Sequence, residues 1–68
     1  MEEVISKLIN ERLELIEAKQ RLYNFISSYG QICNNKYVEL LNKQYSIMSD
    51  YVNVLGDRIA MLKGETND

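Results

Sequence analysis

Apolar residues recur every three or four positions over two long stretches of the chain, which is the spacing of a buried stripe on an α-helix. A cluster of serine, asparagine and other turn-forming residues around Gly30 separates the two stretches. The pattern predicts a first helix at about 2–28, a loop at about 29–34 and a second helix at about 35–63. Because the connection is short, the helices should lie antiparallel. We therefore expect one all-α domain over residues 1–68, an antiparallel two-helix hairpin.

The second predicted helix is apolar over a wider arc than one partner helix can cover. Its apolar residues form three lines at seven-residue spacing: Leu41, Met48, Leu55 and Leu62; Tyr45, Val52 and Ile59; and Ile47, Val54 and Met61. The third line lies well around the helix and would stay exposed on a single hairpin. Exposed hydrophobic strips usually mark interfaces. The pattern therefore predicts a homo-oligomeric helical bundle, such as a tetramer, with the chain itself as partner.

Size and composition point the same way. A 68-residue chain buries only a small core and usually needs a further source of stability. Cys33 is the single cysteine and histidine is absent, so the composition offers neither a disulfide nor a structural zinc site. The net charge of −2 and the mixed charges argue against a DNA or RNA duplex as partner. The sequence has no run of about 18 apolar residues, which argues against a membrane partner.

Five polar residues interrupt the apolar faces. Arg12 and Lys19 fall near the centre of the first helix's stripe, seven residues apart. Gln44, Tyr51 and Arg58 form a line at the same spacing on the second helix. A hairpin that closes near residue 31 would place Lys19 near Gln44 and Arg12 near Tyr51. The five side chains would then form a polar seam along the hairpin.

Buried cations need a partner, and two interpretations of the seam stay open. In the first, the cations reach the edge of the interface or pair with Glu11, Asp50 or Asp57. In the second, they line a pocket in the oligomer and hold a phosphate or another anion. Neighbouring tyrosines would then stack on a base or hydrogen-bond a ribose.

Residue types needed for catalysis are missing or scattered. Without histidine, neither a Ser/His/Asp nor a Cys/His arrangement can form. The sequence contains no glycine-rich phosphate loop, and its carboxylates show no acid–base pairing. We therefore expect a binding protein that is not an enzyme, with no catalytic residues, no cofactor and no metal site.

Two segments carry a resemblance to a known family. The second helix reads Gln44-x3-Met48-x2-Tyr51-x3-Leu55-x2-Arg58-Ile59, and the first contains Arg12-Leu13-Glu14-Leu15 and Leu22-Tyr23-Asn24-Phe25-Ile26. Nearly the whole chain resembles a family of small helical-hairpin proteins of tailed bacteriophages, typified by a protein of a crAss-like phage. Members commonly join their helices through an acidic, Ser/Glu-rich connection, whereas this chain has Gly30 to Asn35.

The resemblance implies an anti-CBASS sponge, a homo-oligomer that binds cyclic di- or oligonucleotide immune signals in the host cell cytoplasm without cleaving them. Cyclic dinucleotides such as 3′,3′-cGAMP are the expected ligands. Gln44, Tyr51 and Arg58 carry over from the resemblance, whereas periodicity alone adds Arg12 and Lys19 to the predicted ligand-binding residues. Two alternatives compete with the sponge. One is a protein-interaction module, an inhibitor of a host protein or a virion assembly factor, that docks through the exposed apolar face. The other is a coiled-coil dimer with a purely structural role.

Overall fold

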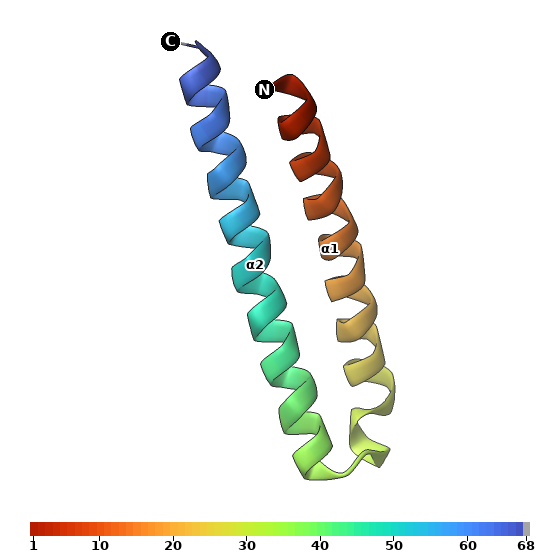
Figure 1. Cartoon of the computed structure of the whole chain (residues 1–68). Helices are drawn as coiled ribbons and strands as arrows, with labels where there is room; N and C mark the ends of the chain where they lie inside the picture. The colour runs from red at the N-terminus through yellow and green to blue at the C-terminus, as the bar shows by residue number, and fades with distance from the viewer. Residues whose placement is uncertain (68) are drawn as a thin grey trace.

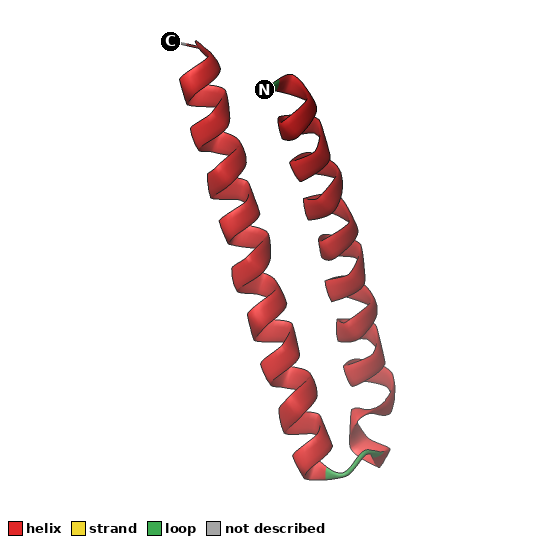
Figure 2. Ribbon diagram, viewed as in Figure 1, coloured by secondary structure: helices red, strands yellow, loops and turns green. Residues whose placement is uncertain are grey.

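The chain folds into two long helices that lie side by side and run in opposite directions (Figures 1 and 2). The structure, a computed structural model, describes residues 1–67, and the side chains of residues 1–64. Helix α1 spans Glu2–Tyr29, a 3-10 turn η1 spans Gly30–Ile32, and helix α2 spans Asn35–Asn67. The molecule measures 52 × 15 × 12 Å, with both termini at the same end. The expected all-helical hairpin is confirmed, with no strand among the described residues.

The observed helix ends differ from the predicted ones most at the end of α2. Helix α1 ends one residue later than predicted, but α2 continues to Asn67, past the predicted end near residue 63. Glycine often ends a helix in a left-handed conformation, but Gly64 lies inside α2. None of the described glycines has a positive φ. The helix continues four residues past the predicted end because this glycine keeps a negative φ and remains helical.

The connection between the helices is a short ordered turn. Gly30 keeps right-handed helical dihedrals (φ −58°, ψ −33°), and the chain then tightens into η1. Cys33 is extended, and this residue releases the chain from the turn toward α2. The Asn34 carboxamide oxygen accepts a hydrogen bond from the backbone N–H of Lys36 at 2.8 Å, which caps the first turn of α2. This cap fixes where α2 begins.

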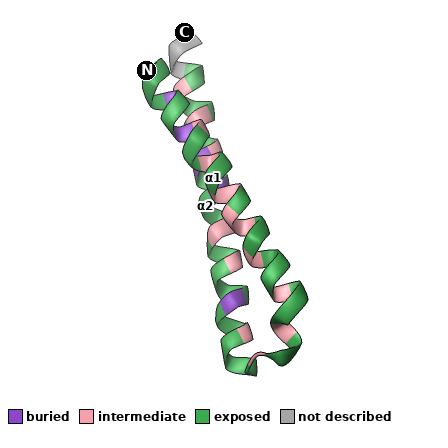
Figure 3. Ribbon diagram, turned by 90° about the vertical axis from the view of Figure 1, so that its right-hand side faces the viewer, coloured by how far each residue is buried: buried purple, intermediate pink, exposed green. Residues whose placement is uncertain are grey.

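The hairpin buries a small core. Among the residues whose side chains the structure describes, five hydrophobic ones are buried: Ile5, Leu8, Leu41, Val52 and Leu55. Most of them lie in the half of the hairpin that holds the termini, and one lies on α2 nearer the turn (Figure 3). Leu55 alone among them is 0% exposed, so it is the centre of this core.

One face of α2 remains apolar and exposed. Ile47, Val54 and Met61 are 58%, 52% and 68% exposed, which confirms that the partner helix leaves this line uncovered. Leu40, seven residues before Ile47, is 62% exposed and extends the line toward the turn. We call these four residues the α2 strip. Over the part of the chain that the structure describes, neither helix carries an apolar stretch that would cross a bilayer.

Candidate functional site

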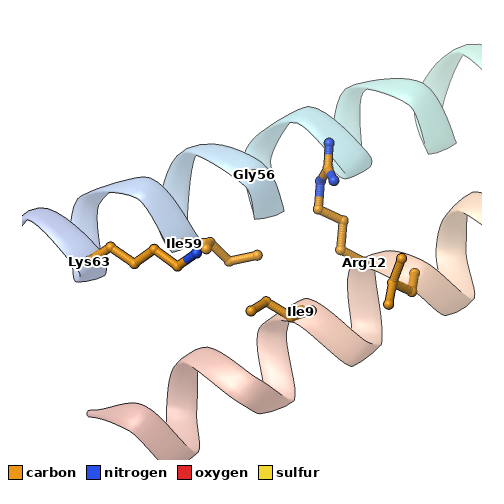
Figure 4. Close-up of a pocket in the computed structure, with 6 residues that line it drawn as sticks. Ile9, Arg12, Gly56, Ile59 and Lys63 are labelled. Carbon is orange, nitrogen blue, oxygen red and sulfur yellow. The ribbon is translucent and has the colours of Figure 1, made fainter.

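Arg12 reaches across the hairpin to the backbone of α2. Its side chain is half-buried, and its Nε donates a hydrogen bond to the carbonyl oxygen of Val52 at 3.1 Å. A Cβ placed on Gly56 would lie 3.2 Å from this Nε and 3.6 Å from both Cζ and Nη2. Figure 4 shows Arg12 extending from α1 toward α2 beside Gly56. The missing side chain at Gly56 therefore makes the space in which the guanidinium lies.

The guanidinium of Arg12 keeps part of its binding capacity. It has five N–H donors, of which the Nε–H is directed to Val52. Among the described residues, no carboxylate forms an ion pair with Arg12, so the pairing with Glu11, Asp50 or Asp57 that one of the two interpretations offered does not occur at this residue. No buried side-chain nitrogen or oxygen in the described part of the chain lacks a partner, so the terminal nitrogens of Arg12 remain accessible to solvent. Their planar fork suits a phosphate or carboxylate.

The open space beside Arg12 is a shallow groove between the two helices. Its volume is about 350 Å³, at the lower end of the range for small-molecule sites. It is lined by Ile9, Arg12, Leu13, Gly56, Ile59 and Lys63 (Figure 4). Apolar side chains form the walls, and the two cationic residues come from different helices. This arrangement suits a ligand that combines an anionic group with an apolar body.

A second cation lies further along the same line of α1. Lys19 is seven residues from Arg12, which is about 10.5 Å along the helix axis. Its Nζ lies 5.2 Å from the centroid of the Tyr45 ring, a cation–π contact, and Lys19 itself is half-buried. The Tyr45 and Tyr23 rings are 6.1 Å apart and tilted by 47°. Lys19 was expected near Gln44, and it contacts the next residue instead.

The other predicted residues lie on a different side of α2. Gln44, Tyr51 and Arg58 are all exposed, and at 100° per residue their line is more than 100° around the helix from Gly56. The Tyr51 hydroxyl donates a hydrogen bond to the Oε2 of Glu11. The structure therefore does not bring the five predicted residues into one seam.

Arg58 borders a separate hollow near the open end of the hairpin. This hollow has a volume of about 260 Å³ and is lined by Val4, Arg58, Met61 and Leu62. Arg58 therefore lies beside Val4, near the start of α1. Its neighbour Met61 belongs to the α2 strip, so this hollow adjoins the exposed apolar face.

Sequence reasoning did not identify the groove beside Arg12. The groove depends on the gap that Gly56 leaves on α2. The residue in the gap is Arg12 of the same chain. The signal that could have found the groove was the register of the hairpin. The register placed Arg12 near Tyr51, and Tyr51 comes one residue before Val52 and five residues before Gly56.

The hydrogen bond to Glu11 raises the pKa of Tyr51, and the negative charge of Glu11 adds to this effect, while nearby Arg58 opposes it. Because the pKa is raised in the folded state, the bond contributes stability below the ordinary tyrosine pKa of about 10 and loses it as pH rises through the raised value. An absorbance titration at 295 nm should show one of the five tyrosines ionising later than the rest. Tyr51→Phe should remove that late step. A late step that persists in the variant would assign it to another tyrosine.

Comparisons with known proteins place this geometry in a family context. A family model described as Sequestin matches residues 2–61, which covers α1, the turn and most of α2. No curated protein and no solved structure matches the chain. Within the described residues, no group of three or more His, Cys, Asp or Glu side chains is placed to hold a metal ion.

Proposed function

Because the chain belongs to the Sequestin family, we propose that it captures a small phosphate-bearing nucleotide and withholds it without changing it chemically. The family name denotes sequestration and supports capture as the activity. The observation that carries the ligand class is the guanidinium of Arg12, which is anchored on the Val52 carbonyl beside a groove that Arg12 helps to line, with its terminal nitrogens accessible to solvent. Anchoring one side of the guanidinium orients the rest of the fork, so less side-chain entropy is lost when an anion binds.

The remainder of the site supports a nucleotide over a simple anion. Apolar walls from Ile9, Leu13 and Ile59 suit the nucleoside beside a phosphate. Lys19 and the rings of Tyr45 and Tyr23 lie nearer the turn, beyond the lining of the groove, and offer a face on which a base can stack. Two separated cations on one line suit a ligand that carries more than one phosphate.

We assign cyclic oligonucleotide immune signals as the ligand, with cyclic dinucleotides such as 3′,3′-cGAMP first. A small hairpin that binds such a signal tightly would lower its free concentration and leave the effector of an anti-phage defence unactivated. The biological role is then that of a bacteriophage sponge in the host cell cytoplasm, directed against CBASS. The resemblance of the α2 pattern to phage hairpin proteins supports this part of the proposal.

Thermal unfolding against a panel of nucleotides tests the proposal. The panel holds cyclic di-, tri- and tetranucleotides together with NAD-derived signals. A ligand at 100 times its Kd stabilises the folded state by about 2.7 kcal/mol. For a domain of this size we expect that to raise Tm by about 10–20 °C. A shift with an NAD-derived signal alone would keep capture and change the ligand class. No shift with any member would overturn the proposal and favour a protein-interaction module that docks through the α2 strip.

Replacing Gly56 with alanine should weaken binding by about 10-fold, because the new methyl group would lie 3.2 Å from the Arg12 Nε, so the guanidinium must shift by a few tenths of an ångström and its hydrogen bond to the Val52 carbonyl weakens. Gly64→Ala is the matched control. A Cβ at Gly64 meets nothing within 4 Å, so this variant changes helix propensity without touching Arg12. Isothermal titration of both variants measures the difference. Equal affinities for the two would show that the position of Arg12 does not matter for the ligand.

A further inference from the structure

The α2 strip is an apolar surface that nothing in the hairpin covers. Its four residues repeat at seven-residue spacing from Leu40 to Met61 and therefore follow one line with a slight drift around the helix. A second helix that supercoils gently around α2 can follow such a line over its whole length. The strip thus has the periodicity of a helix–helix contact.

The amount of exposed surface indicates how large the missing contact is. The hairpin exposes 5394 Å², whereas a compact monomer of 8.0 kDa exposes about 4,450 Å². The excess of about 900 Å² is close to the roughly 800 Å² that each partner buries in a stable protein–protein interface. One copy of a similar hairpin is therefore enough to cover it.

We propose that the α2 strip is the contact between two copies of this chain, packed antiparallel about a two-fold axis that passes between residues 50 and 51. This register places Leu40 against the partner subunit's Met61 and Ile47 against the partner subunit's Val54. The other two contacts follow from the symmetry. Each strip residue then meets an apolar residue, as a self-complementary two-fold interface requires.

Charges beside the strip favour the antiparallel arrangement. Lys43, Asp50 and Asp57 follow one edge of the strip, and all three are exposed. In the antiparallel pair Lys43 lies beside the partner subunit's Asp57, and only Asp50 faces its own copy. By symmetry the antiparallel arrangement gives two attractive contacts along this edge against one repulsive contact at Asp50.

The same geometry leaves the groove of each copy open. Gly56 is two residues from Val54 and thus about 200° around α2, on the far side from the strip. The hollow beside Arg58 and Met61 adjoins the strip, so a second copy would cover it. The dimer would present two outward grooves, and Arg58 would belong to its interface. This inference stands without the proposed function, since it concerns the hairpin in the absence of any ligand.

Disulfide trapping in mixed samples tests the register. With Cys33→Ser as background, one chain carries Ile47→Cys and another carries Val54→Cys. Each variant is oxidised alone and in a 1:1 mixture, without nucleotide, and analysed on non-reducing gels after circular dichroism has shown it to be helical. We expect the mixture to give several-fold more linked dimer than either variant alone. The proposal would be overturned if Ile47→Cys alone gave as much linked dimer as the mixture, or if the mixture gave no linked dimer.

Sedimentation equilibrium supplies an independent measurement on the unmodified chain. The native protein should sediment as a dimer or a multiple of it, and Val54→Glu should shift it toward monomer. Ile32→Glu, at an 81% exposed position in η1, is the matched control and should leave the mass unchanged. A native protein that is monomeric at tens of micromolar would contradict the proposal. Because no ligand is present, failure here is distinct from failure of nucleotide capture.

Discussion

Replacing Arg12 with glutamine should weaken nucleotide binding by about 100-fold, because the variant loses the charge and the fork that meet the phosphate. Glutamine keeps a donor long enough to approach the Val52 carbonyl, so the hairpin should stay folded. The affinity of Arg12→Lys should fall between those of the native protein and Arg12→Gln, since lysine keeps the charge but cannot present two parallel donors. Isothermal titration with the ligand identified by the thermal panel measures all three affinities.

Arg21→Gln provides the matched control for this prediction. Arg21 is exposed and lies nine residues after Arg12, which is half a turn around α1 and hence on the opposite face. The same substitution there should change affinity less than two-fold, at about the precision of the measurement. If Arg12→Gln binds as tightly as Arg21→Gln, the groove beside Gly56 is not the nucleotide site.

Replacing Leu55 with alanine should destabilise the hairpin by about 2–5 kcal/mol. Leu55 is 0% exposed, and truncation leaves a cavity between two helices with a small buried core. A domain with a total stability of about 5–15 kcal/mol loses a large part of it in this way. Urea unfolding followed by circular dichroism, at one fixed protein concentration, measures the change.

Leu13→Ala is the control for Leu55. Leu13 is 53% exposed, so the same truncation should cost only about 0.5 kcal/mol. The contrast between the two leucines tests the packing directly. If Leu13→Ala destabilises the hairpin as much as Leu55→Ala, then the helices do not pack on the faces described.

Periodicity predicted the hairpin because local spacing determines which face of each helix is buried. The seven-residue lines on α2 also predicted an exposed strip, and the exposures of Ile47, Val54 and Met61 confirm it. The end of α2 was not predictable in this way. Glycine permits a left-handed helix end without requiring it, and Gly64 remains helical. Composition does not show which of the two conformations the surrounding chain selects.

The candidate site was predictable only in part, because it depends on side-chain reach between helices. The predicted register of the hairpin placed Arg12 near Tyr51. Register does not determine the direction in which the guanidinium points. The gap at Gly56 and the carbonyl of Val52 set that direction. Tyr51 lies on another side of α2, where its hydroxyl donates a hydrogen bond to Glu11 of α1. The single polar seam predicted from helical periodicity is therefore replaced in the structure by two separate surfaces, one around Arg12 and one around Tyr51.

Capture without chemical change is the central claim, and recovery of the ligand tests it most directly. The purified protein, in molar excess, is mixed with the nucleotide that gives the largest thermal shift, and free nucleotide is measured in an ultrafiltrate. The protein is then heat-denatured and the released nucleotide is identified by chromatography and mass spectrometry. We predict that the free nucleotide disappears and that intact nucleotide returns in full after denaturation. Unchanged free nucleotide, or release of a hydrolysed product, would contradict the account.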